Sequence, residues 1–391
     1  MNNEKQEYRF PPESILHHYS EIDGFEINPS TDARTDILVK VFKQFGTEAW
    51  IERIFQGPTF MQYRFGFEQG TFKSAILRDA CTFGHNILAD DVRIIPPGPN
   101  SPFICVEVPN EKRFTVGFEK MVSALETSKA HVPMALGMDV EGNCLVADAT
   151  SLQHVLLLGD TGSGKTVFIN SLVSSVLYSK TPAQVRLQIA DCNYQGLSVY
   201  NGIPHFISPM MAEPQEVLDA LKNLCLEMER RMVLFKNSSA TSIRAYNNSM
   251  EQKGRSESIL PYIVFIIDEF EPLMNGFRTE FEFWIKRITA VARFCGIHLV
   301  LSTRFVDQDI ISTVVRRNIP STLTFRIKDA ARQVRGIVTE DASKLQGRGD
   351  FLYADTFSQI VRRIQGAFIE AEIDEISNYA KTGTNKSESV S

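Results

Sequence analysis

The stretch from His154 to Val173 constrains the fold more than any other part of the chain. Its first part, Val155 to Leu158, is apolar and predicts a buried strand. An apolar pattern at helical spacing follows Thr166 and continues to Val176. A strand, a glycine-rich turn, Gly-Lys-Thr and a helix form a P-loop. The predicted phosphate-binding residues are Gly159, Asp160, Thr161, Gly162, Ser163, Gly164, Lys165 and Thr166.

Each residue type in this loop has a chemical reason. Three glycines let the backbone wrap so that its N–H groups face phosphate oxygens, and the helix N-terminus adds partial positive charge. Lys165 can reach the β- and γ-phosphates, and the Thr166 hydroxyl can bind Mg²⁺. The alternative is a plain glycine turn between strand and helix. The agreement of strand, turn, motif and helix favours the P-loop, with ATP and Mg²⁺ as cofactors.

A second apolar run, within Ile263–Phe270, ends in two acidic residues. A carboxylate at the end of a buried strand beside a P-loop is suited to binding Mg²⁺. We therefore predict that Asp268 holds Mg²⁺, directly or through water, and that Glu269 is the general base for the attacking water. The alternative is a pair of acids that only caps the strand.

The next apolar strand, Leu299–Thr303, should lie beside the strand that ends at Asp268. Arg304 would then point toward the nucleotide and could sense the γ-phosphate, although it could also be a solvated arginine at a strand end. A ring ATPase also needs a positive charge from the neighbouring subunit. Downstream candidates for that arginine are Arg316, Arg317, Arg326, Arg332 and Arg335.

The length and composition bound the class of protein. A chain of 391 residues predicts two or three domains. The net charge of −6 argues against a protein coated with basic surface, but not against nucleic acid held in a local channel. The six cysteines are scattered without a Cys-x-x-Cys pair, which is typical of reduced thiols in the cytoplasm. The sequence contains no run long enough to cross a bilayer, so we expect no membrane insertion.

The order of predicted elements divides the chain. We expect an irregular lead-in over residues 1–30, an α+β domain over 31–130, an ATPase motor domain over 131–380 and a disordered tail over 381–391. The domain over 131–380 is predicted to be an α/β fold with a doubly wound, mostly parallel sheet. Smaller predictions are helices over 31–45, 72–89, 214–235 and 281–294, a hairpin over 134–148, and a polar, mobile stretch over 236–258.

With these residues placed, the sequence resembles the FtsK–SpoIIIE family of double-stranded-DNA translocases over residues 8 to 370 or so. The motifs FPPESIL, GPTFMQYRFGF and ICVEVPNEKR resemble its α domain and the entry to its motor. Further motifs resemble the family's RecA-like β domain, namely MALGMDVEGNCLVADA, HVLLLGDTGSGKT, LSVYNGIPHF, EMERRM, LPYIVFIIDEF, GIHLVLST, NIPSTLTF and GRGDFLY.

The resemblance implies a homohexameric ring around duplex DNA, with ATP bound between adjacent subunits. It places Asn275–Glu280 and the following helix in the region of the family's pore loops, so Arg278 and Lys286 are predicted DNA contacts. The sequence shows no membrane-spanning region before the motor and no winged-helix domain after it. A freestanding cytoplasmic motor is therefore the expectation.

Three positions depart from the family pattern. The family's Thr-Gln-Arg-Pro is Thr303-Arg304-Phe305-Val306 here, and an arginine of its NIPTR motif aligns with Thr322. Its Asp-Pro-Lys becomes Asp191-Cys192-Asn193. These changes keep open a second function, an ATP-binding coupling or assembly subunit of a conjugation or secretion machine. A third is movement of single strands.

Overall fold

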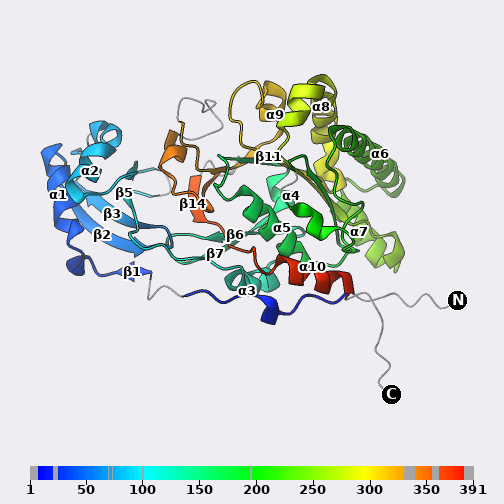
Figure 1. The fold of residues 1–391 in the computed structure, drawn as a ribbon, viewed down its shortest axis with the longest axis horizontal. Coiled ribbons are helices and arrows are strands. Elements are labelled where there is room, and N and C mark those ends of the chain that lie inside the picture. Colours follow the sequence, from blue (N-terminus) through cyan, green and yellow to red (C-terminus); the bar gives the residue numbers. More distant parts are fainter. Residues whose placement is uncertain are drawn as a thin grey trace, which may run out of the picture.

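The computed structural model describes residues 8–20, 25–68, 70–72, 74–98, 101–193, 196–329, 340–354 and 361–382. Figure 1 shows a small unit, blue to cyan, beside a larger one that contains the rest of the chain. The predicted tail over 381–391 falls almost wholly outside the described residues. No helix within the described ranges combines the length and the apolar character that a membrane crossing requires.

The small unit is a five-stranded antiparallel sheet in the order β1-β2-β3-β5-β4. Its helix α1 forms because Leu38, Val41 and Phe42 make one apolar stripe, which packs on the Phe65 and Phe83 rings. Its elements are β1 (Glu26–Ile27), α1 (Arg34–Gln44), β2 (Ala49–Gln56), β3 (Phe60–Phe67), α2 (Ala80–Ile87), β4 (Arg93–Ile95) and β5 (Ile104–Pro109).

The helix predicted over 72–89 is shorter than expected. A 3₁₀ turn over Ser74–Arg78 comes first, and α2 starts only at Ala80. The break occurs at Asp79, whose carboxylate accepts the backbone N–H of Thr82 at 3.3 Å. A side chain that caps a helix start competes with helix continuation, and the sequence periodicity did not reveal this competition.

The large unit contains a nine-stranded sheet among its described residues, in the order β7-β6-β14-β13-β12-β8-β11-β10-β9. The strands from β12 to β9 are parallel, whereas those from β12 to β7 pair antiparallel. Their bounds are β6 (Pro133–Met138), β7 (Cys144–Asp148), β8 (Val155–Leu158), β9 (Val185–Asp191), β10 (Tyr262–Asp268), β11 (Ile297–Thr303), β12 (Ser321–Phe325), β13 (Asp350–Ala354) and β14 (Val361–Gln365).

The sheet is therefore mixed rather than mostly parallel. The P-loop strand β8, β11 and β10 follow the doubly wound prediction, and β10 is buried throughout because it pairs with a parallel strand on each side. The predicted hairpin over 134–148 is present as β6 and β7, but it extends the opposite end of the sheet from β9. The strands β13 and β14 were not predicted.

The helices of the large unit fall into two groups. Helix α5 packs on α3 and α10, whereas α6 packs on α7 and α8, and α8 packs on α9. Right-handed crossovers place α5 on one face of the parallel strands and α6 to α9 on the other. The bounds are α3 (Glu119–Thr127), α4 (Ala149–Leu152), α5 (Lys165–Ser179), α6 (Pro214–Ser238), α7 (Ile243–Gln252), α8 (Glu271–Val291), α9 (Thr313–Asn318) and α10 (Ile373–Thr382).

Helix α7 corrects the prediction of a mobile stretch over 236–258. Its buried side chains Ile243, Tyr246 and Met250 follow an i, i+3, i+7 pattern on one face. The Ser242 hydroxyl accepts the N–H of Ala245 at 3.3 Å and starts the helix. The polar residues between these three positions hid a short amphipathic helix.

Two segments near the predicted domain limits pack on the large unit. Helix α3 contributes Met121, Val122 and Leu125 to the core of that unit, as do Ile15 and Leu16 of the lead-in. The packing favours a boundary after β5, close to residue 110, over the boundary at 130. The position of the boundary between the two domains stays a prediction.

Candidate nucleotide site

Two of the three glycines of the predicted P-loop, Gly159 and Gly164, occupy positions where a side chain has no room. Gly164, which precedes α5, has a φ of +113°, and a Cβ there would lie 2.5 Å from the Gly349 nitrogen. A Cβ on Gly159 would lie 2.6 Å from the Phe325 Cβ. The loop thus runs against β12 and against the turn before β13. Asp160 joins it to the segment after β12, since its carboxylate accepts the Lys328 N–H at 2.8 Å.

The Lys165 ammonium lies folded back on this loop. Its Nζ donates to the Gly159 carbonyl at 2.6 Å and to the Asp160 carbonyl at 3.2 Å. Burial lowers the pKa of Lys165, while Asp268 and Glu269 oppose that change. The phosphates of a nucleotide would offer the ammonium stronger partners than two neutral carbonyls.

Asp268 lies within reach of the P-loop threonine, although β11 separates its strand from β8. Its Oδ2 is 3.3 Å from the Thr166 Oγ1. Burial raises the pKa of Asp268 to about 6, against the opposing effects of Ser302 and Lys165. The carboxylate and the hydroxyl are oxygen ligands of the kind that Mg²⁺ bound to a triphosphate would use, and the nearby ammonium would bind the phosphates.

Glu269 is anchored by the end of β11. The Thr303 hydroxyl donates to Oε1 at 2.6 Å, and the Arg304 N–H donates to Oε2 at 3.1 Å. The residue is 4% exposed and adopts a left-handed backbone with φ +61°. That conformation is uncommon for a residue with a side chain and turns the carboxylate toward Thr303. The Arg304 guanidinium lies near the same group, with Nε 3.8 Å from Oε2.

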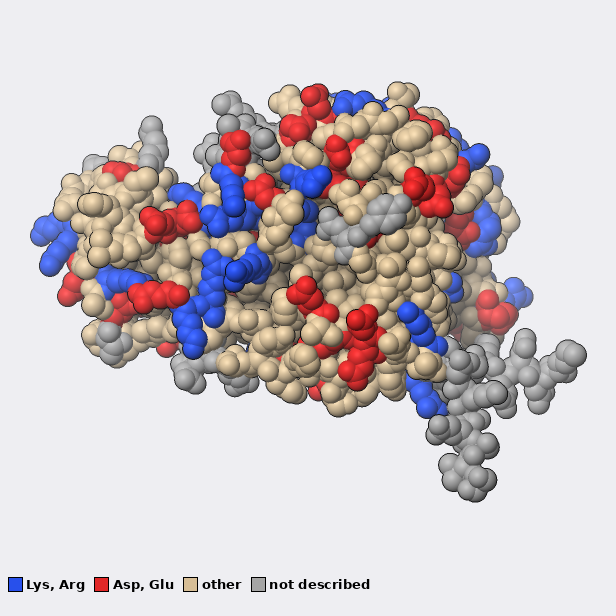
Figure 2. Space-filling view, viewed as in Figure 1, with Lys and Arg blue, Asp and Glu red and all other residues tan. Residues whose placement is uncertain are grey.

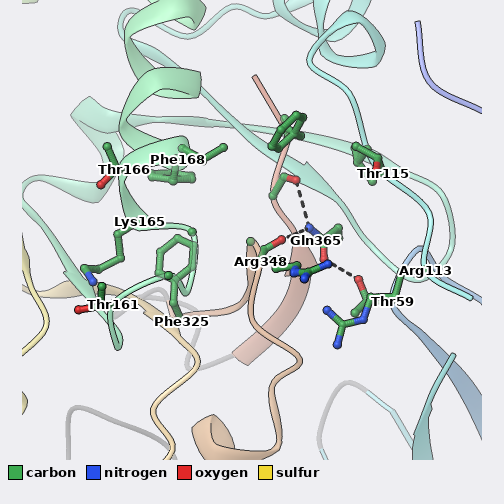
Figure 3. A pocket seen from close by; sticks show the side chains of 18 of the residues that line it. Thr59, Arg113, Thr115, Thr161, Lys165, Thr166, Phe168, Phe325, Arg348 and Gln365 are labelled. Carbon is green, nitrogen blue, oxygen red and sulfur yellow. Dashed lines mark hydrogen bonds between the residues drawn. The ribbon is translucent and has the colours of Figure 1, made fainter. Parts of the chain in front are cut away.

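These residues line a cavity of about 560 Å³. We call its two sides the phosphate wall and the far wall. Figure 3 shows Lys165, Thr161 and Thr166 on one side and Arg348, Gln365, Thr59 and Arg113 on the other. The phosphate wall is defined by Thr161, Gly162, Gly164–Thr166, Asp268 and Glu269, and the far wall by Thr59, Arg113, Arg348 and Gln365. The rings of Phe168, Phe325 and Phe368 also line the cavity.

The far wall was not predicted, although Thr59, Arg113 and Arg348 belong to motifs quoted above; Gln365 does not. Thr59 comes from the turn between β2 and β3 of the small unit, and Arg113 from the segment that leaves that unit. Arg348 belongs to the GRGD turn, and Gln365 ends β14. No local pattern marks them as neighbours. The pairing of β13 with β14 brings Arg348 and Gln365 together, and the contact between the two units adds Thr59 and Arg113.

The remaining predicted residues lie apart from the cavity lining. Arg278 and Lys286 are exposed on α8, and the Arg278 guanidinium bonds the Asp309 carbonyl. Thr322 is buried in β12, which pairs with β8 on one side and with β13 on the other. Among the arginine candidates, Arg316 and Arg317 are exposed on α9, Arg326 is 3.6 Å from Asp91, and Arg332 and Arg335 lie outside the described residues.

Family comparisons agree with this architecture. Residues 10–110 match the FtsK alpha domain, and residues 120–316 match the FtsK/SpoIIIE family. The chain belongs to the FtsK/SpoIIIE family. It is 34% identical to the DNA translocase FtsK of Clostridium acetobutylicum over 99% of this chain and 51% of that protein. It is also 34% identical to the DNA translocase FtsK of Staphylococcus aureus strain Mu50, over 95% and 48%. The chain thus spans about half the length of these relatives.

Solved structures share the P-loop ATPase fold. The pCW3 conjugation coupling protein TcpA, in a monomer form with ATPγS, has a TM-score of 0.60 at 17% identity and covers 89% of this chain and 99% of that one. The cytoplasmic domain of the Thermomonospora curvata type VII secretion ATPase EccC has a TM-score of 0.56 at 19% identity, over 66% and 32%. At these identities the likeness supports the fold alone.

Proposed function

We propose that this FtsK/SpoIIIE family member hydrolyses ATP and uses the energy to translocate duplex DNA. The observation that carries the proposal is the convergence of Lys165, Thr166, Asp268 and Glu269 on one cavity. Its relatives at 34% identity carry the name DNA translocase. A homo-oligomeric ring of six subunits is part of the proposal, since a translocase must stay closed around its track while individual sites turn over.

The chemistry assigned to this chain is electrostatic and acid–base. Lys165 and the P-loop N–H groups would bind the β- and γ-phosphates, and Thr166 and Asp268 would hold Mg²⁺, which neutralises phosphate charge when bound. Glu269 would accept a proton from the attacking water. Its anchor to Thr303 and to the Arg304 N–H fixes where that carboxylate lies. An arginine from a neighbouring subunit would complete the charge around the γ-phosphate.

The charge distribution is compatible with DNA bound locally. Figure 2 shows acidic and basic side chains interspersed over one face, with a group of Lys and Arg over the junction between the small and large units. Arg278 and Lys286 are proposed to contact DNA phosphates from α8. The six free thiols fit a reducing compartment, and we place the protein in the cytoplasm.

The decisive test is Glu269→Gln with ATPase assays on duplex DNA, on single-stranded DNA and without DNA. We expect ATP binding to persist and duplex-stimulated hydrolysis to fall by about 10²-fold or more. Glu271→Gln, the next acid along the chain, is the control and should keep most activity. Hydrolysis by the Glu269→Gln variant at the parent rate would remove Glu269 from the base role.

A second function is favoured by Thr322 and Arg304, which depart from the family pattern. The chain would then be an ATP-binding coupling or assembly subunit with little translocation. Its rate of ATP hydrolysis would then be the same with duplex DNA, with single-stranded DNA and without DNA. Stimulation by single-stranded DNA alone would instead indicate movement of single strands. Electron micrographs with an ATP analogue and duplex DNA would show six-fold rings on DNA only for the translocase.

A further inference from the structure

Two ties from the small unit end on the turn that backs the P-loop. The turn is Gly347–Asp350, in which the first three residues have φ between +52° and +90°. The Gly349 N–H donates to the P-loop Ser163 carbonyl at 2.8 Å, and the Gly366 N–H donates to the Gly349 carbonyl at 2.7 Å. A displacement of this turn would therefore displace the P-loop backbone as well.

The first tie runs through Thr59, which is 1% exposed in the turn between β2 and β3. Its hydroxyl donates to the Gln365 Oε1 at 2.5 Å, and Gln365 Nε2 donates to the Arg348 carbonyl at 2.9 Å. Figure 3 shows these two bonds in sequence across the far wall. One amide thus links the small unit to the middle of the Gly347–Asp350 turn.

The second tie is a buried ion network. Arg363 of β14 donates to both carboxylate oxygens of Asp350 at 3.0 and 2.7 Å, and to Glu107 of β5 at 2.9 Å. Arg93 of the small unit lies 3.2 Å from the same Glu107 oxygen. The Arg363 guanidinium also stacks on the Phe60 ring, 4.1 Å from its centroid.

Stability alone does not account for this network. Its side chains are at most 7% exposed, and moving charges out of water costs about as much as their pairing returns. A well-packed apolar core would hold two domains together equally well. A directional network instead fixes the orientation of the groups that it joins, here β5, β14 and the turn behind the P-loop.

We propose that Arg363 and Gln365 are positioning residues that hold the Gly347–Asp350 turn against the P-loop, with Glu107 and Thr59 of the small unit as their anchors. ATP affinity then depends on how the small unit is docked. This inference rests on the proposed nucleotide site, and it assigns to the small unit a role in nucleotide binding from within the same subunit.

The first test removes one hydroxyl. Thr59→Val should raise the dissociation constant of a fluorescent ATP analogue and the KM for ATP by about 3- to 10-fold, with kcat within about twofold. Thr59→Ser keeps the donor and should restore the parent affinity. The matched control is Thr47→Val, which removes a buried hydroxyl bonded to the Thr71 carbonyl elsewhere in the small unit and should leave ATP affinity unchanged.

The second test uses a residue outside the cavity lining. Arg363→Lys keeps the charge but cannot bond both oxygens of Asp350 and Glu107 together, so its ATP KM should also rise several-fold. Parent-like ATP affinity in Thr59→Val, or an equal loss in Thr47→Val, would overturn the positioning role. If the parent chain binds no ATP, the proposed nucleotide site and this inference are both wrong. If the parent chain binds ATP and Thr59→Val binds it equally well, only this inference is wrong.

Discussion

The two walls of the cavity are built in different ways. The phosphate wall comes from one continuous loop and from the end of a buried strand, all within the large unit. The far wall combines Thr59, Arg113, Arg348 and Gln365, which span more than three hundred positions of the chain. In our proposals the phosphate wall carries the chemistry, and the far wall helps to set the position of the P-loop. Assays of affinity, stability and pH dependence can separate these two contributions.

The largest effect is expected at the phosphate wall. Lys165→Ala removes the ammonium that we propose binds the phosphates, so ATPase activity should fall on the order of 10³-fold and the fluorescent ATP analogue should no longer bind at micromolar concentration. Lys180→Ala, at the other end of α5, is the matched control and should behave like the parent. Retained binding in Lys165→Ala would show that the far wall dominates nucleotide affinity.

The next effect belongs to the buried ion network of Arg363, Asp350 and Glu107 behind the far wall, and it should appear in stability. Arg363→Met leaves Asp350 and Glu107 buried without their shared cation, which should lower the free energy of unfolding by about 3–5 kcal/mol in urea titrations. Arg287→Met breaks an exposed ion pair with Glu229 and should unfold like the parent. Equal unfolding midpoints for the two variants would contradict the anchoring of the small unit by charge.

The pH dependence should belong to the phosphate wall. The pKa of Asp268 is raised to about 6, so below pH 6 the folded protein holds a proton that Mg²⁺ must displace. The Mg²⁺-dependent part of ATP affinity should therefore fall by about tenfold per pH unit below pH 6 and level off above it. The raised pKa means that the folded protein binds this proton more tightly than the unfolded chain does. The free energy of unfolding should therefore decrease as pH rises from the usual aspartate value of 3.8 to about 6.

Asp268→Asn is the control for that titration. Measured in the same buffers, it removes the titrating carboxylate and leaves only the titration of the nucleotide itself. A pH profile that is identical in the parent and in Asp268→Asn would mean that Asp268 does not hold the metal.

The smallest effect is expected outside both walls. Lys286→Ala should weaken duplex binding modestly, reduce the slope of log affinity against log salt by about 1, and leave ATP affinity without DNA unchanged. The control is Lys236→Ala on the exposed side of α6. An unchanged salt slope in Lys286→Ala would remove α8 from the proposed DNA contacts.

The difference between the walls also explains what the sequence could predict. Lys165, Thr166 and Asp268 follow from local patterns, because a buried strand and a glycine turn fix where the next side chain lies. Thr59 and Gln365 depend on how two units dock, and no periodicity encodes that docking. The mixed sheet was missed for a different reason, since β13 and β14 are short strands whose antiparallel pairings leave no mark in the local sequence pattern.

Helix α7 shows a different limit. Its three buried residues lie among asparagines and serines, so composition pointed to a loop although the spacing was helical. Glu269 shows a third limit of prediction from the sequence. Its place after β10 was predicted, but not the left-handed backbone that turns it toward Thr303, because that conformation depends on partners supplied by β11.

The lead-in gives the small unit an unusual attachment. The last residues of the lead-in contact the large unit through Tyr19, whose backbone N–H donates to the Glu119 carboxylate at 3.2 Å. After the small unit the chain returns to the large unit at Gly117, which lies against the aromatic ring of Tyr19. The described residues on either side of the two connections therefore lie at one edge of the large unit. The buried Glu107–Arg363 hydrogen bond is a separate contact between the two units, so reorienting the small unit would require breaking a desolvated ion pair.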